Sequence, residues 1–187
     1  NSEMMANAGA DILVTTLPYY LSYSVCEAQC DLERIIDKIS MPIVLYNIPE
    51  LIRISMDPVW VAEMAEHENI VGYKDSSGDI NHLLDVLRLT KDKDFKVFIG
   101  KELLVYKALT EGASGVVSSF SNSMPELFVK IYDFITAGEK NSARIYQDRI
   151  NRMVENFVTL PGSQSFSKLM FFLEQGLSEN GIKLRLH

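Results

Sequence analysis

The stretch IVGYKDSSGDINHLLDVLRLTK, Ile70–Lys91, decides the fold of this chain. It opens with β-branched and apolar side chains, and this composition predicts a short strand over residues 70–76. Beyond Gly78 the apolar residues recur at helical spacing, which predicts a helix over residues 79–91 with Asp79 as its N-cap. A strand followed at once by such a helix is one unit of a parallel α/β sheet.

The same unit recurs along the whole chain. Further apolar runs predict strands at 11–16, 42–47, 96–100 and 115–119. Helical patterns follow them at 24–40, 57–67, 101–112 and 123–138, and two more helices are expected in 139–158 and 164–176. Near-continuous apolar runs are typical of strands that are buried on both faces, as in parallel sheets.

Local signals predict where several of these helices begin and end. Asp57 is the expected N-cap of the second helix. Ser123 and Glu126 have the Ser-x-x-Glu spacing of a capping box. Gly112 and Gly138 are expected to end the helices that precede them.

Two architectures fit five βα units. One is an open, doubly wound sheet of the flavodoxin type. The other is part of a (β/α)8 barrel, which normally needs about 250 residues. The pattern does not separate the two. In both, functional residues gather at the carboxyl ends of the strands, so these ends are where chemistry is expected.

The composition of the chain is that of an ordinary globular protein. It has 187 residues, 47% hydrophobic and 23% charged, and we expect residues 1–187 to form one domain. The net charge of −7 argues against nucleic acid or an anionic membrane as the main partner. No apolar run reaches the roughly 18 residues that span a bilayer, and we expect a cytoplasmic protein. Cys26, Cys30 and the scattered histidines do not make a zinc site.

The residues at the strand ends suit amine chemistry on a carbonyl group. No glycine-rich phosphate motif and no nucleophile elbow is present, whereas Lys74 lies within the end of an apolar strand. A lysine amine attacks a ketone to form a Schiff base, and burial favours the free amine by lowering the pKa from about 10.4. Tyr46 lies one residue from the end of the preceding strand, and its hydroxyl is a candidate for moving protons near Lys74.

Simpler interpretations of the same residues stay open at this point. A lysine after a strand is most often a solvated surface residue. A tyrosine such as Tyr46 is usually a half-buried core residue with its hydroxyl in water. Asp75 and Asp79 can simply begin the next helix.

Five motifs at the strand ends resemble those of a known family. GADILVTTLPYY, MPIVLYNIP, NIVGYKDSSGD, VFIGKE and GASGVVSSFSN occur in the order and spacing of the dihydrodipicolinate synthase and N-acetylneuraminate lyase family. The resemblance covers essentially the whole chain, and the pair YNIP and KDSSGD, about 28 residues apart, is quite specific. It implies a class I, pyruvate-dependent aldolase on a (β/α)8 barrel.

The resemblance also implies roles for individual residues. Lys74 matches the lysine that forms the Schiff base with pyruvate or another 2-oxo acid, and Tyr46 matches the proton-transfer residue. Tyr20 matches a tyrosine that reaches into the partner subunit's site, and a homotetramer built as a dimer of dimers is implied. The positions that match the substrate's surroundings are Ser76, Gly100, Glu102, Val117 and Ser119.

The chain departs from the family pattern in its extent. It matches only the fourth to eighth strands, and the family's early Gly-Thr-Thr-Gly-Glu segment would lie before Asn1. Five strands do not close a barrel, and open edges expose unpaired backbone and apolar surface. We therefore expect the 187-residue chain by itself to be unstable or to aggregate, and to be inactive.

Two further departures concern the substrate. The synthase branch carries an arginine where this chain has Leu51, and Arg53 lies two residues further on. The sialic acid lyases tend to carry an acidic pair where this chain has Lys101, Glu102 and Leu103, so only one acid matches. Both departures favour another 2-oxo acid, with a 2-keto-3-deoxy sugar acid as the first choice.

The expected function is therefore that of a Schiff-base aldolase or lyase that cleaves or forms a C–C bond in 2-oxo acids. No metal or organic cofactor is expected, because the protonated imine is itself the electron sink. Three alternatives stay open: the synthase that condenses pyruvate with aspartate semialdehyde, an N-acetylneuraminate lyase, and a non-catalytic α/β binding module.

Overall fold

The computed structural model describes residues 2–20 and 22–159. Its strands form one parallel sheet in the order β1-β2-β3-β4-β5. A doubly wound sheet reverses its strand order part-way, whereas a barrel adds each new strand beside the last. The sequential order therefore excludes the doubly wound alternative and confirms the partial barrel. The strands are β1 Leu13–Thr15, β2 Ile43–Asn47, β3 Ile70–Asp75, β4 Lys96–Ile99 and β5 Gly115–Val116.

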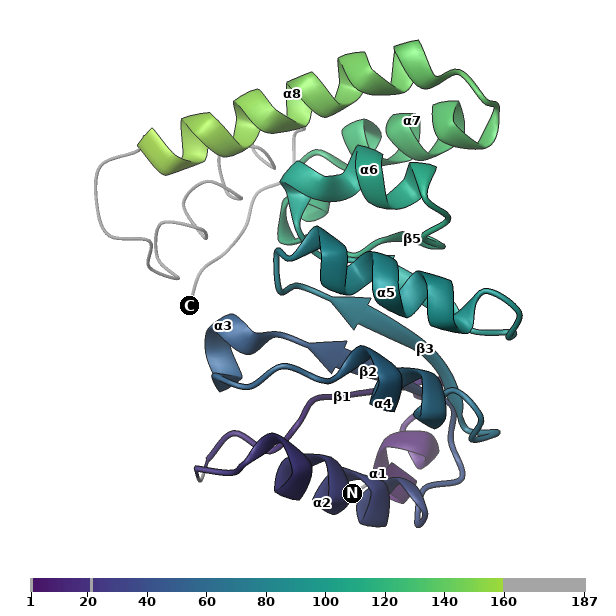
Figure 1. Ribbon diagram of the computed structural model, residues 1–187. Helices are drawn as coiled ribbons and strands as arrows, with labels where there is room; N and C mark the ends of the chain where they lie inside the picture. The colour runs from purple at the N-terminus through teal and green to yellow at the C-terminus, as the bar shows by residue number, and fades with distance from the viewer. Residues whose placement is uncertain (1, 21, 160–187) are drawn as a thin grey trace.

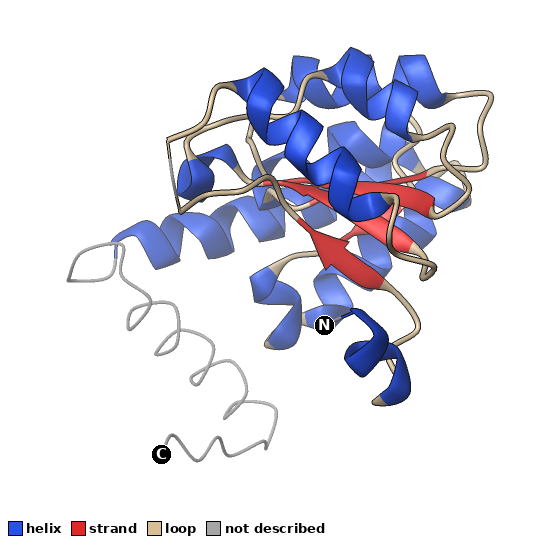
Figure 2. Cartoon of the chain, turned by 90° about the horizontal axis from the view of Figure 1, so that it is seen from below, coloured by secondary structure: helices blue, strands red, loops and turns tan. Residues whose placement is uncertain are grey.

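Helices alternate with these strands as predicted, and Figure 1 shows the βα units stacked in chain order. Figure 2 shows the strands gathered in one layer with helices around them. Three helices were not predicted, α1, α3 and η2, and the helix expected in 164–176 lies outside the described residues. The helices are α1 Ser2–Asn7, α2 Val25–Ile36, α3 Pro49–Ile52, α4 Pro58–Met64, α5 Ile80–Thr90, η1 Glu102–Leu104, α6 Val105–Thr110, η2 Ser119–Asn122, α7 Pro125–Thr136 and α8 Lys140–Thr159.

The predicted capping box of Ser123 and Glu126 is wrong. The N-cap of α7 is Met124, and it makes no side-chain capping bond. The hydroxyl of Ser123 instead donates to the carbonyl oxygen of Phe120 at 3.2 Å, within the turn that ends η2. The short helix η2 places Ser123 inside that turn, so the motif spacing alone did not predict the cap.

The core lies between the sheet and its helices. In β2, buried and half-buried residues alternate, because successive side chains of a strand point to opposite faces. The buried residues of β2 face the helices, and the half-buried ones, Val44 and Tyr46, face the other side. Within the part of the chain described, no helix is long and apolar enough to cross a membrane. Fully buried core side chains include Ile36, Leu45, Val61, Leu83 and Ile99.

Candidate active site

Tyr46 and Lys74 are direct neighbours at the carboxyl ends of β2 and β3. They are register partners across the two parallel strands. The Nζ atom of Lys74 lies 4.1 Å from the centroid of the Tyr46 ring, so the ammonium group stacks on the ring face. Both side chains are half-buried on the sheet face away from the helices. The structure thus brings together the two residues that the sequence singled out for chemistry.

Gly100 and Ser76 pack against this pair. The backbone N–H of Gly100 donates to the carbonyl oxygen of Asp75 at 2.7 Å, which continues the β3–β4 pairing beyond the strands. A β-carbon at residue 100 would overlap the Oγ atom of Ser76 and would lie 3.1 Å from the Cε atom of Lys74. Only glycine leaves room here for both side chains.

We call the edge of the sheet at the carboxyl ends of the strands, with the loops that follow them, the rim. Residues after β5 form its next part. Val117 is 46% exposed, and its N–H donates to the carbonyl oxygen of Ile99 at 2.9 Å. Ser119 is exposed at the start of η2. Its neighbour Ser118 is buried and donates its hydroxyl to the carboxylate of Glu102 at 2.5 Å. Glu102 is thus anchored by Ser118, a residue that sequence reasoning missed.

The backbone of Glu102 is also held from α8. The side-chain amide of Gln147 donates to the Glu102 carbonyl oxygen at 3.0 Å and accepts from the N–H of Tyr106 at 2.7 Å. These two bonds fasten η1 and the start of α6 to α8. The rim that carries Glu102 is therefore fixed from two sides.

Tyr20 lies apart from this group of residues. Its side chain is 92% exposed, just after β1. It lines a pocket of about 510 Å³ with Thr16, Pro18 and Tyr23, between the end of β1 and α2. The exposure of Tyr20 does not test its expected role at a subunit interface, so that role stays a prediction.

An ion pair joins α3 to the residue that precedes η1. Lys101 Nζ lies 2.7 Å from the Glu50 carboxylate, and the Lys101 side chain passes beside Gly78. The hydrogen bond and charge of Lys101 lower the pKa of Glu50. Leu51 and Arg53, which stand near the family's arginine position, are both exposed, and Arg53 ends α3 in a left-handed conformation. The ion pair thus holds the Lys101 cation near α3.

The interpretation of Asp79 as a helix cap is confirmed, whereas that of Asp75 is wrong. Asp79 is the N-cap of α5 and accepts hydrogen bonds from the N–H groups of Asn81 and His82. Asp75 is the last residue of β3, is only 1% exposed, and hydrogen-bonds the side chain of Asn47 at 3.2 Å. Sequence reasoning missed this buried pair, since it depends on the strand register.

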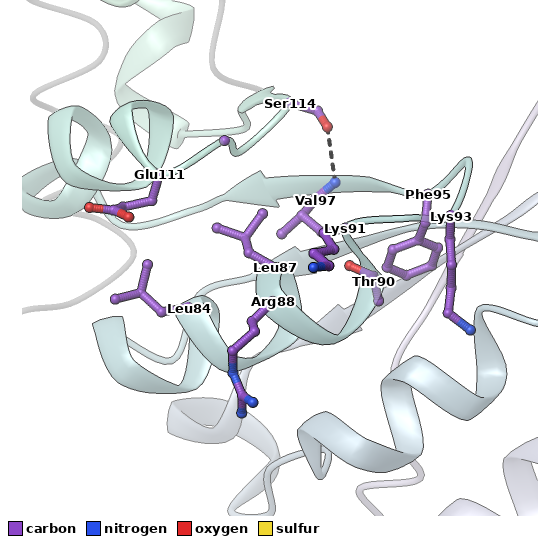
Figure 3. Close-up of a pocket in the computed structure, with 11 residues that line it drawn as sticks. Leu84, Leu87, Arg88, Thr90, Lys91, Lys93, Phe95, Val97, Glu111 and Ser114 are labelled. Carbon is purple, nitrogen blue, oxygen red and sulfur yellow. Dashed lines mark hydrogen bonds between the residues drawn. The ribbon is translucent and has the colours of Figure 1, made fainter.

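Another pocket lies away from Lys74 and Tyr46. It has a volume of about 530 Å³ and lies between α5, the start of β4 and the end of α6, as Figure 3 shows. Two of its three cationic side chains are engaged, since Arg88 pairs with Asp85 and Lys93 with Glu66, whereas Lys91 lies 3.9 Å from Asp92. The pocket is at the amino-terminal ends of the strands, opposite Lys74, and such a place in a barrel usually serves stability.

The two cysteines lie on α2. Cys26 and Cys30 are free thiols on the exposed face of α2, and their mutual hydrogen bond raises the pKa of Cys30. Within residues 2–20 and 22–159, no three His, Cys, Asp or Glu side chains are grouped to hold a metal ion.

Sequential parallel βα units with reactive side chains at the strand ends define a protein of the (β/α)8-barrel class. The chain belongs to the dihydrodipicolinate synthetase family, whose model matches residues 1–173. It is 32% identical over 146 residues to a 4-hydroxy-tetrahydrodipicolinate synthase of Natronomonas pharaonis, covering 78% of this chain and 50% of that protein. A synthase of the same name from Methanoculleus marisnigri is 34% identical over 139 residues, covering 74% of this chain and 47% of that protein.

Solved structures agree with this assignment. The dihydrodipicolinate synthase of Bacteroides thetaiotaomicron superposes with a TM-score of 0.84 at 26% identity, covering 100% of this chain and 64% of that one. A 2-keto-3-deoxygluconate aldolase from Picrophilus torridus shares the fold, with a TM-score of 0.82 at 24% identity over 98% of this chain and 65% of that one. The chain spans about half the length of the curated relatives it matches.

Proposed function

We propose that the whole polypeptide carrying this chain is a Schiff-base-forming aldolase or lyase acting on pyruvate and 2-keto-3-deoxy sugar acids. The observation that carries the proposal is the pairing of Lys74 and Tyr46 at the carboxyl ends of two adjacent strands, 4.1 Å apart from Nζ to ring centroid. Membership of the dihydrodipicolinate synthetase family supports the same chemistry.

In the proposed mechanism the neutral amine of Lys74 attacks the ketone carbon of the 2-oxo acid. Loss of one water from the carbinolamine gives an imine, and its protonated form accepts the electron pair of the C–C or C–H bond that breaks. Tyr46 carries the proton to or from the reacting oxygen or carbon. The protonated imine supplies the electron sink, so the proposal needs no metal and no organic cofactor.

The remaining rim residues are proposed to bind substrate. Ser76 and Gly100 pack next to Lys74, so they border the reacting carbon. Val117 and Ser119 follow β5, where the hydroxyl of Ser119 is a suitable donor to the substrate carboxylate. Glu102, anchored by Ser118, is suited to accept hydrogen bonds from sugar hydroxyls.

A synthase that condenses pyruvate with aspartate semialdehyde is the second candidate. Curated relatives at 32% and 34% identity carry the name of that synthase, which favours it. Leu51, exposed where the synthase branch has arginine, favours the first candidate. A homotetramer is part of the proposal too, and the 92% exposure of Tyr20 supports its burial against a partner.

Borohydride trapping tests the proposal. The whole polypeptide is incubated with pyruvate and borohydride, and its mass is measured before and after. We expect a stable adduct that maps to Lys74 and is absent from Lys74→Ala and from Lys74→Arg, because a guanidinium does not form the imine. Absence of an adduct from the wild type supports a non-catalytic module instead, and persistence of the adduct in Lys74→Ala defeats the role of Lys74.

A substrate panel then separates the candidates. Turnover is compared for 2-keto-3-deoxygluconate, N-acetylneuraminate, and pyruvate with aspartate semialdehyde. Fastest turnover of the first supports the sugar-acid aldolase. Fastest turnover of either of the others assigns the corresponding lyase or synthase, and native mass measurement gives the subunit number.

A further inference from the structure

Asn47 and Asp75 are the register pair of β2 and β3 that follows the pair of Tyr46 and Lys74. The register pairs Tyr46 with Lys74 and then Asn47 with Asp75. Successive side chains point to opposite faces of a sheet, so the second pair lies on the helix side, directly behind the first. Asn47 is fully buried and Asp75 is 1% exposed.

The amide of Asn47 has a fixed orientation. Its Oδ1 atom accepts from the backbone N–H of Met56 at 3.1 Å and from the hydroxyl of Ser55 at 3.2 Å. Because a backbone N–H can only donate, the oxygen must face Met56 and the Nδ2 atom must face β3. Nδ2 then donates to the Oδ1 atom of Asp75 at 3.2 Å, a bond that crosses directly between the two strands.

Asp75 in turn fixes the loop after β3. Its Oδ1 atom accepts from the N–H of Ser77 at 2.8 Å, and its Oδ2 atom accepts from the hydroxyl of Ser77 at 3.1 Å. The Ser77 hydroxyl also accepts from the N–H of Asp79 at 3.1 Å. The loop held in this way carries Ser76, which packs at Gly100.

His82 extends this polar cluster from α5. Its Nε2 atom lies 2.8 Å from the hydroxyl oxygen of Tyr73 and 3.4 Å from Nδ2 of Asn47. Burial, together with the nearby charge of Asp75, raises the pKa of Tyr73 well above its usual value. Tyr73 and His82 thus extend the cluster from β3 to the start of α5.

We propose that Asn47 and Asp75 are positioning residues, which hold the ends of β2 and β3 in register so that Tyr46 stays stacked on Lys74. Burying a carboxylate costs stability, and the Asp75 partners described above are neutral groups. A polar network that satisfies each member fixes geometry that an apolar contact would leave free to slide. The inference rests on the proposed function of Tyr46 and Lys74.

The test uses pyruvate alone as the probe. Once the imine has formed, removal of a methyl proton gives the enamine, and return of a deuteron from D₂O exchanges the methyl hydrogens. NMR follows this exchange and gives kcat and KM, while borohydride trapping reports whether Lys74 still forms the imine. Urea unfolding of each variant gives its stability, and rates are expressed per folded site.

Three variants probe the pair. Asp75→Asn keeps the shape of the side chain but weakens the acceptor, and Asn47→Asp places two carboxylates where a 3.2 Å hydrogen bond was. The double variant Asn47→Asp with Asp75→Asn restores an interstrand bond with donor and acceptor exchanged, at the loss of the Ser77 N–H bond. Asn69→Ala is the control, since Asn69 is also partly buried but bonds the Ile39 carbonyl oxygen at the other end of β3.

We expect imine trapping to persist in the variants, kcat for exchange to fall about 10- to 100-fold in Asn47→Asp, and KM to change little. In Asp75→Asn we expect a smaller fall in kcat, and in the double variant part of the lost kcat should return. Asn69→Ala should lose stability but keep the wild-type kcat. Unchanged kcat per folded site in both single variants, or no recovery in the double variant, overturns the positioning role. If the wild type itself forms no adduct with pyruvate, it is the proposed function that has failed.

Discussion

The hydroxyl of Ser76 fills the space beside Gly100 that a β-carbon would occupy. The same β-carbon would also lie 3.1 Å from both the Cε atom of Lys74 and the carbonyl oxygen of Asp75. The side chains of Lys74, near the end of β3, and of Ser76, just after it, thus pack against the end of β4 because residue 100 has none. The close approach ties the identity of this glycine to the position of Lys74.

Gly100→Ala is expected to lower the free energy of unfolding by about 1–3 kcal/mol, the usual cost of overpacking. Adding Ser76→Ala removes the worst overlap, and part of the stability should return. Gly115→Ala is a matched control, since its β-carbon would meet only the Phe98 ring, at 3.3 Å. Urea denaturation measures all three. A Gly100→Ala variant as stable as the wild type would contradict the close packing.

Tyr46→Phe separates imine formation from proton transfer. The phenyl ring keeps the stacking on Lys74, so borohydride should still trap the pyruvate adduct. Loss of the hydroxyl removes the general acid–base group, and kcat should fall about 10²- to 10⁴-fold. Steady-state kinetics and the adduct mass are measured on the same preparation. Wild-type turnover in Tyr46→Phe would remove Tyr46 from the proposed mechanism.

The ion pair of Lys101 and Glu50 predicts a small dependence of stability on pH. Lys101 lowers the pKa of Glu50 in the folded state, so the pair stabilises the fold above the unfolded pKa, and this contribution is lost as the pH falls through the lowered value. Lys101→Met should therefore cost at most about 1 kcal/mol at pH 7, because the pair is exposed, and nothing in strong acid. Urea titrations at both pH values test this.

Lys91→Met is the control for that titration. Lys91 and Asp92 are exposed and lie 3.9 Å apart, so their pairing is weak. We expect the same stability for this variant and the wild type at both pH values. An equal loss in Lys91→Met and Lys101→Met would show that the effect comes from net charge and not from the bridge to Glu50.

Hydrophobic patterning was sufficient to predict the βα units. The predicted strand 70–76 is observed as Ile70–Asp75, and the predicted helix 79–91 as Ile80–Thr90. Patterning could not decide between a barrel and a doubly wound sheet, because the order of the strands in the sheet depends on tertiary pairing. Helix α3 was missed because four residues are too few for a periodic signal.

The sequence was enough to predict the reactive residues of the candidate site, but only some of the residues that hold them in place. Lys74 and Tyr46 could be found because each lies near the carboxyl end of an apolar strand. The bond between Asn47 and Asp75 could not, since it joins residues 28 apart whose contact depends on register. Ser118, and not the neighbouring Ser119, anchors Glu102, because the alternation of strand faces ends where η2 begins.

Glu102→Gln tests the proposed acceptor-binding role. The amide keeps the size of the side chain and its bond from Ser118, but loses the charge that strengthens hydrogen bonds to substrate hydroxyls. If the substrate is a 2-keto-3-deoxy sugar acid, kcat/KM should fall about 10- to 100-fold, whereas trapping of pyruvate at Lys74 is unchanged. Ser118→Ala should give a smaller loss of the same kind. Equal kcat/KM for Glu102→Gln and the wild type assigns sugar recognition to other residues.

Asp79 lies in the same motif as Lys74, and its variants test whether its carboxylate only caps α5 or also takes part in the reaction. Its carboxylate caps α5 by accepting from the N–H groups of Asn81 and His82 at 2.9 and 3.3 Å. Asparagine caps helices about as well as aspartate, so Asp79→Asn should keep both stability and turnover. Asp79→Ala should lose about 1 kcal/mol of stability with unchanged turnover per folded site. Thermal unfolding and kinetics measure the two effects, and a stable Asp79→Asn variant with impaired turnover would mean that this carboxylate has a part in the reaction.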